Sequence, residues 1–127
     1  MNLEKVVFGF FIILALTLNF GFVLGQIDNP DHHNVYELFF AIVVNIIAMV
    51  LKFGDRTQIG AVLLATSLVA NLQLIIAAML WAYAANVAAD GMTAAMMASI
   101  VSLSAGALLA NLISVVLLII ETVNLRR

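Results

Sequence analysis

Hydrophobic residues are grouped along this chain into four long uncharged runs. The runs cover residues 6–26, 38–51, 59–89 and 91–120. A helix needs about 20 apolar residues to cross the hydrocarbon core of a bilayer, and all runs but the second are long enough. The second run has 14 residues, or roughly 21 Å of helix, so it spans only if polar flanking residues enter the membrane. The pattern predicts four transmembrane helices, near residues 5–26, 30–53, 56–89 and 92–124.

Composition narrows the class of protein further. Hydrophobic residues make up 65% of the 127 residues and charged residues 9%, which is typical of membrane proteins. The chain has no cysteine, which excludes thiolate metal sites and cysteine nucleophiles. Its 5 basic residues are too few for a nucleic-acid-binding surface. We expect an all-α membrane protein with a single domain, residues 1–127, whose first partner is the lipid bilayer.

The basic residues predict the topology. They are Lys5, Lys52, Arg56, Arg126 and Arg127, which precede the first span, separate the second from the third, and follow the fourth. The connections at residues 26–37 and at Asp90 contain no lysine or arginine. Because cytoplasmic loops are enriched in basic residues, both termini are expected on the cytoplasmic side of an antiparallel bundle.

Turn residues indicate where the second and third helices begin. Gly54 suits a left-handed cap after the second helix, and Asp55 with Gln58 has the spacing of a capping box. Before the second helix, Pro30 at a first helical position and Asn34 at an N-cap are alternative starts. The sequence leaves these two starts open.

Small and polar residues form one stripe along the second span. At steps of three or four they are His33, Glu37, Ala41, Asn45, Ala48 and Lys52. Such a face points at protein or water rather than lipid. The first interpretation is close packing, with Asn45 hydrogen-bonded to a neighbouring helix. The second is an ion path lined by Ala41 and Ala48, with Asn45 as its constriction and Glu37 as a carboxylate ring at the outer mouth. An acidic collar would lie above this ring, formed by Asp28, Asp31 and His33.

The third and fourth spans carry packing signals. Small residues recur at every fourth position of the fourth span, which allows close approach of helices: Ala94, Ala98, Ser102, Gly106, Ala110 and Ser114. On the third span, Asn71 and Gln73 lie about 160° apart around the helix. In an isolated bundle one of these amides would face lipid, at a cost of several kcal/mol. We therefore predict a homo-oligomer in which the third span lies between its own bundle and another subunit.

Each span contains a central asparagine: Asn19, Asn45, Asn71 and Asn111. Asn19, Asn71 and Asn111 are each about 14 or 15 residues from the nearest cytoplasmic charge, which predicts a belt of amides at one depth. Asn111 belongs to a polar seam of the fourth span that ends near Glu121. We expect Glu121 to form an ion pair with Arg56 or Lys52.

The polar residues before the second span raise the question of a metal site. His33 and Glu37 have the i, i+4 spacing of two zinc ligands, and Asp31 or His32 could add a third. The same spacing is common in helix caps and interfaces, which is the favoured interpretation. No nucleophile–histidine–acid order, phosphate loop or cofactor motif is present in the sequence. We expect neither an enzyme nor a bound cofactor.

Three stretches, MNLEKVVFGFF, DNPDHHNVYELF and LKFGDRTQIGA, together resemble a family of small, uncharacterised four-span inner-membrane proteins of proteobacteria. The resemblance covers essentially the whole chain and implies a location in the bacterial inner membrane, but no activity. The leading hypothesis from the residues is an oligomeric, channel-like protein that conducts monovalent or divalent cations. The alternatives are a scaffold that packs against another membrane complex, and a metal-binding module.

Overall fold

The computed structural model describes residues 3–55 and 57–125. Within these ranges the chain forms four α-helices, one short 3₁₀ helix and no strand. They are α1 (Leu3–Val23), η1 (Pro30–His32), α2 (Val35–Lys52), α3 (Gln58–Asn86) and α4 (Ala94–Leu125). All four α-helices are long and apolar enough to cross a membrane. The prediction of an all-α protein with four helices of membrane-spanning length and apolarity is confirmed.

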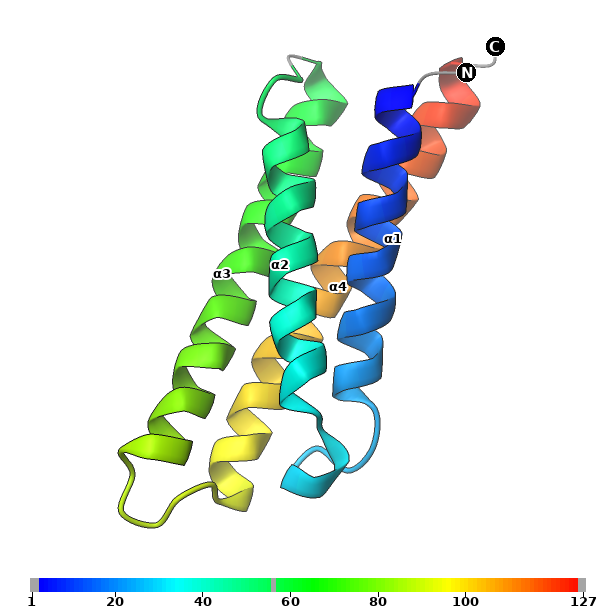
Figure 1. The fold of residues 1–127 in the computed structure, drawn as a ribbon. Coiled ribbons are helices and arrows are strands. Elements are labelled where there is room, and N and C mark those ends of the chain that lie inside the picture. Colours follow the sequence, from blue (N-terminus) through cyan, green and yellow to red (C-terminus); the bar gives the residue numbers. More distant parts are fainter. Residues whose placement is uncertain (1–2, 56, 126–127) are drawn as a thin grey trace.

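The helices pack side by side in one bundle (Figure 1). The start of α1, the turn between α2 and α3 and the end of α4 lie together at one end, here called the terminal end. The α1–α2 loop and the α3–α4 connection lie at the opposite end, the loop end. Each helix packs against the next in the chain, and α1 also packs against α4, which closes the ring.

The α1–α2 loop uses both of the helix-start signals in the sequence. The side chain of Asn29 accepts a hydrogen bond from the backbone of Asp31 and begins η1, with Pro30 at its first position. The side chain of Asn34 accepts from the backbone of Tyr36 and begins α2. The two alternatives therefore describe two successive elements.

The turn between α2 and α3 differs from its prediction. Thr57, not Asp55, is the N-cap of α3, because its hydroxyl accepts from the backbone of Gly60. Asp55 instead accepts hydrogen bonds from the backbone and the hydroxyl of Thr57. Gly54 is not left-handed: in the described ranges only Gly25 and Gly91 have positive φ. Asp55 therefore organises the start of α3 through its hydrogen bonds with Thr57.

The apolar core of the bundle is divided into two clusters. The terminal cluster contains Phe8, Ile12, Ala48 and Leu63, each at most 1% exposed. The loop cluster is larger and includes Phe22, Leu38, Ala41, Ala70, Leu74, Ile100 and Ala110. Each cluster contains side chains from several helices, and the two clusters lie at different levels along the bundle. The candidate site lies between these two levels.

Candidate functional site

A layer of polar side chains separates the two apolar clusters. On α1, Asn19 lies between Ile12 of the terminal cluster and Phe22 of the loop cluster. On α2 and α3, Asn45 and Ser67 have the same position between the two clusters, and on α4 Asn111 and Ser114 follow Ala110 of the loop cluster and precede the partly buried Leu118, which packs on the terminal cluster. Asn71 lies one turn beyond Ser67, between Ala70 and Leu74 of the loop cluster. The polar layer consists of Asn19, Asn45, Ser67, Asn71, Asn111 and Ser114, each no more than 4% exposed. Polar groups from all four helices therefore meet inside the membrane-spanning part of the bundle.

Hydrogen bonds fix the direction of two amides in this layer. The Asn45 Nδ2 donates to the backbone oxygen of Ala41 at 2.8 Å. The Asn71 Nδ2 donates to the backbone oxygens of Ser67, at 2.9 Å, and of Asn45, at 3.1 Å. Because both amide nitrogens are held by backbone carbonyls, the atoms left over are the side-chain oxygens.

Several buried atoms of the polar layer have no hydrogen-bond partner among the described residues. They are both amide atoms of Asn19 and of Asn111, the side-chain oxygens of Asn45 and Asn71, and the hydroxyl of Ser67. Buried polar atoms in proteins are nearly always paired, and lipid offers no partner. The layer is therefore chemically suited to receive a polar species.

The two polar faces of α3 are both covered within one chain. Asn71 contacts α2, whereas Thr66 hydrogen-bonds to Ser114 of α4. The Gln73 amide packs over Gly106 of α4, where a Cβ atom would lie 2.6 Å from its nitrogen. Both amides therefore have neighbours within one chain, but the side-chain oxygens of Asn71 and Gln73 have no hydrogen-bond partner among the described residues. The homo-oligomer stays a prediction.

The small-residue ridge of α4 changes its environment along the helix. Ala110 and Ser114 are buried, Gly106 is half-buried and Ser102 is exposed. Its inner part therefore packs inside the chain's own bundle, and only the part near the loop end is open to the surroundings.

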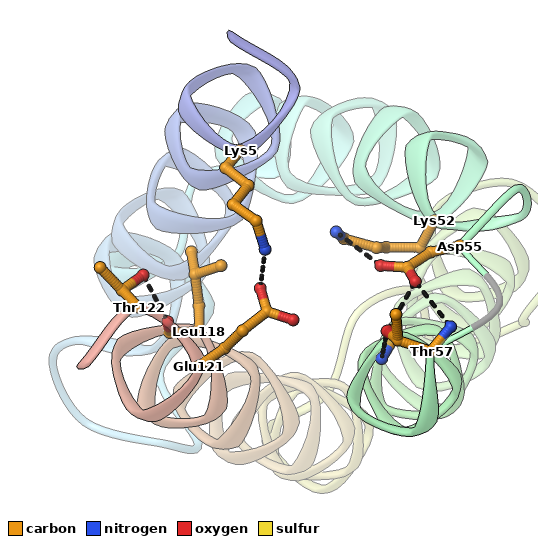
Figure 2. A network of polar contacts seen from close by, with 8 residues as sticks. Lys5, Lys52, Asp55, Thr57, Leu118, Glu121 and Thr122 are labelled. Carbon is orange, nitrogen blue, oxygen red and sulfur yellow. Dashed lines mark hydrogen bonds and ion pairs between the residues drawn. The ribbon is translucent and has the colours of Figure 1, made fainter. Parts of the chain in front are cut away.

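A cavity of about 680 Å³ opens at the terminal end, between α1, α2, α4 and the α2–α3 turn. Figure 2 shows four of its charged groups in two pairs, Lys5 with Glu121 and Lys52 with Asp55, and Glu4 also lines the cavity. The Lys52 nitrogen is 3.5 Å from the Asp55 carboxylate and 4.2 Å from the ring centre of Phe8. Phe8 belongs to the terminal cluster, so this cluster lies at the base of the cavity.

The ion pair of Glu121 at the terminal end differs from the predicted one. Glu121 pairs with Lys5 rather than with Lys52, and Arg56 lies outside the described residues. Hydrogen bonds from the hydroxyl and the backbone of Thr57 hold the pKa of Asp55 below its ordinary value, and the charge of Lys52 adds to them against the opposing effect of burial. Sequence spacing gave no signal for the Lys5–Glu121 pair, because these residues are 116 positions apart.

At the loop end, Glu37 and His33 face α1. Gly21 of α1 leaves room for the half-buried Glu37 carboxylate, with which a Cβ atom at that position would collide. His33 is 5% exposed, and its two ring nitrogens lie 2.6 and 2.7 Å from the backbone oxygens of Phe22 and Gln26. Asp28 and Asp31 are exposed.

This arrangement does not favour a metal at His33. Both of its ring nitrogens face backbone carbonyls, so neither directs a lone pair toward a ligand site. Across residues 3–55 and 57–125, no three histidine or carboxylate side chains are placed to share a metal ion.

The predicted stripe on α2 lies inside the chain's own bundle. Ala41, Asn45 and Ala48 are fully buried, and Asn71 of α3 bonds to the backbone of Asn45. The stripe therefore does not line an axis between subunits. Ser67 was not among the predicted path residues, because a single serine in an apolar span is indistinguishable from an ordinary packing position.

Comparison with known proteins gives one match. The model of a family of unknown function, DUF6394, matches residues 32–122, which extend from the end of η1 through most of α4. No curated protein and no solved structure matches the chain.

Proposed function

The chain belongs to the DUF6394 family of unknown function, and we propose that it conducts small cations through the interior of its own four-helix bundle. The observation that carries the proposal is the polar layer, with its unpaired buried atoms, inside four apolar helices. Polar groups are costly within a membrane and mark ion or substrate pathways. The path differs from the original hypothesis in one respect: it runs within each chain rather than between chains.

The distribution of charge supports a cation as the transported species. The loop end carries four of the seven acidic residues, Asp28, Asp31, Glu37 and Asp90, and the sequence of its two connections, residues 26–37 and Asp90, contains no lysine or arginine. A mouth with this charge raises the local concentration of cations. By the positive-inside rule we place this end at the outer face and both termini in the cytoplasm. The resemblance to small inner-membrane proteins of proteobacteria supports a location in a bacterial inner membrane.

The terminal cluster acts as the closed gate in this proposal. Phe8, Ile12, Ala48 and Leu63 are fully buried and separate the cavity at the terminal end from the polar layer. Hydrophobic constrictions close ion paths by excluding water. Opening would require α1 to move relative to α2 and α3, which supply these side chains. A homo-oligomer, if it forms, places several such paths side by side.

Cation flux from liposomes tests the proposal. Purified protein is reconstituted, and efflux of K⁺ is compared among wild type, Asn45→Leu and Glu37→Gln. Asn45→Leu should abolish the flux, and Glu37→Gln should lower it. Asn86→Leu is the matched control, because Asn86 also donates to the carbonyl four residues earlier but is exposed.

Two results would contradict the proposal. Flux that is unchanged in Asn45→Leu would remove the polar layer from the pathway. Complete absence of flux from folded, correctly inserted protein would favour the competing role, a scaffold that packs against another membrane complex.

A further inference from the structure

We infer that the polar layer is a binding site for one monovalent alkali cation, held by neutral side-chain oxygens of α2 and α3. This site would be the place where the conducted cation binds, so the inference rests on the proposed function for the route by which the ion enters the bundle. The oxygens in question belong to Asn45, Asn71 and Ser67, which are between 0% and 4% exposed.

The orientation of the amides determines whether the ligand is a cation or an anion. An asparagine side chain can offer either a donor nitrogen or an acceptor oxygen. The side-chain nitrogen of Asn45 already donates to the backbone carbonyl of Ala41. That of Asn71 donates to the backbone carbonyls of Ser67 and Asn45. The side-chain oxygens of both residues have no partner among the described residues. Two fixed acceptors attract a cation and repel an anion.

The three residues meet at one interface. The Asn71 amide bridges from the backbone of Ser67, one turn earlier on α3, to the backbone of Asn45 on α2. The Ser67 hydroxyl, also unpaired within the described ranges, belongs to the same turn of α3. Asn19 of α1 and Asn111 of α4 lie between the same two apolar clusters, and their unpaired amides can turn an oxygen inward to complete the shell.

The charge of the ligand follows from the charge of the oxygens. Calcium sites in proteins use several carboxylates, and magnesium sites use carboxylates with retained water. The members of the polar layer are all neutral, and moving a charge out of water becomes far more costly as the charge increases. Neutral carbonyl oxygens replace the hydration shell of K⁺ in channel filters. The layer therefore fits a monovalent alkali ion better than a divalent one.

Equilibrium binding in detergent micelles tests this inference without requiring transport. The melting temperature of the purified protein is measured by the fluorescence of its single tryptophan, Trp81, which packs against Phe22 of the loop cluster. KCl, NaCl, choline chloride and CaCl₂ are compared at equal ionic strength. A ligand that binds only the folded state raises the melting temperature as its concentration increases, which gives an apparent Kd.

The expected result has two parts. KCl or NaCl should stabilise the protein relative to choline chloride and CaCl₂. Asn45→Leu and Asn71→Leu should each raise the apparent Kd about 10- to 100-fold, the range expected for loss of one interaction with a charged group. Asn86→Leu should leave the Kd unchanged. Each variant removes an oxygen from a different helix, so either one suffices if the other fails to fold.

Other outcomes overturn the inference. Equal melting temperatures of the wild type in alkali and choline chloride mean that the layer holds water only. Equal stabilisation by CaCl₂, or binding that survives both substitutions, places the ion elsewhere. Binding without flux contradicts the proposed conduction and leaves the site intact, whereas flux without binding contradicts the site alone.

Discussion

At the level of single residues, His33 makes an unusual pair of contacts. Both nitrogens of its buried ring face backbone carbonyl oxygens, of Phe22 and Gln26. Phe22 is in the last turn of α1, and Gln26 lies in the α1–α2 loop. His33 thus ties the end of α1 to the start of α2.

Removing the His33 ring should destabilise the α1–α2 loop. We expect His33→Ala to lower the free energy of unfolding by about 1–3 kcal/mol, because buried carbonyls lose their donors. His32→Ala, at an exposed neighbouring position, should have a smaller effect. Thermal unfolding measures the difference. Equal destabilisation by the two substitutions would contradict a structural role specific to the His33 ring.

Asp55 predicts a pH dependence of stability. Hydrogen bonds from Thr57 lower the pKa of its carboxyl in the folded state below the ordinary value of 3.8. The charged form is therefore favoured by folding, and this stabilisation is present above pH 3.8 and is lost as the pH falls through the lower, folded-state pKa. Asp55→Asn should remove this contribution. When the pH is lowered below 3.8, the stability of this variant should therefore fall less than that of the wild type.

Unfolding by denaturant across the acidic range tests this prediction. Asp90→Asn, which changes an exposed carboxyl at the loop end, is the control. Parallel curves for wild type and Asp55→Asn would mean that the turn does not depend on the charge of Asp55.

At the level of helices, periodicity predicts which face of α2 avoids lipid but not what covers it. The spacing of Ala41, Asn45 and Ala48 correctly indicated one protected face, and all three side chains are buried. Whether that face meets its own bundle or a second subunit depends on contacts between distant segments, which local spacing does not contain. The same reason explains α3, whose two polar faces suggested another subunit but are covered by α2 and α4.

The contact between α3 and α4 depends on a small residue at Gly106. A single methyl group there would push aside the flexible Gln73 amide, so Gly106→Ala should be tolerated. Gly106→Leu should overpack the interface and lower stability by about 1–3 kcal/mol.

Ser102→Leu is the matched control for this helix, one turn away on the same ridge but exposed. Thermal unfolding with size-exclusion chromatography distinguishes the two positions. Equal destabilisation at Gly106 and Ser102 would contradict the packing described here. A change of oligomeric state confined to Ser102→Leu would instead assign the exposed end of the ridge to contacts between copies.

At the level of the whole molecule, the sequence predicted the four membrane helices better than the cavities and contacts between them. Runs of apolar residues are local, so all four membrane helices were predicted. The predicted belt of Asn19, Asn71 and Asn111 at one depth stays a prediction: all three are buried, but along α3 Asn71 lies between Ala70 and Leu74 of the loop cluster. The terminal cavity and its Lys5–Glu121 pair were not anticipated, because they depend on how α1 packs against α4.

The terminal cluster provides the last prediction, because it separates the terminal cavity from the polar layer. Phe8 is the largest side chain of this cluster, and the Lys52 nitrogen lies over its ring. We expect Phe8→Ala to increase K⁺ flux in liposomes, since a smaller side chain admits water to the constriction. The substitution should also destabilise the fold by about 3–5 kcal/mol, so Leu63→Ala provides a second opening at a different helix. Phe10→Ala, at a 61% exposed position of α1, is the control.

A double variant distinguishes an open path from a damaged membrane seal. If the ions released by Phe8→Ala pass through the polar layer, adding Asn45→Leu should return the flux to a low value, because leucine removes an oxygen from the layer and places an apolar side chain there. If the flux arises from general leakage around a loosened bundle, the second substitution should leave it unchanged. Suppression by Asn45→Leu but not by Asn86→Leu would therefore connect the gate and the layer in a single pathway within one chain.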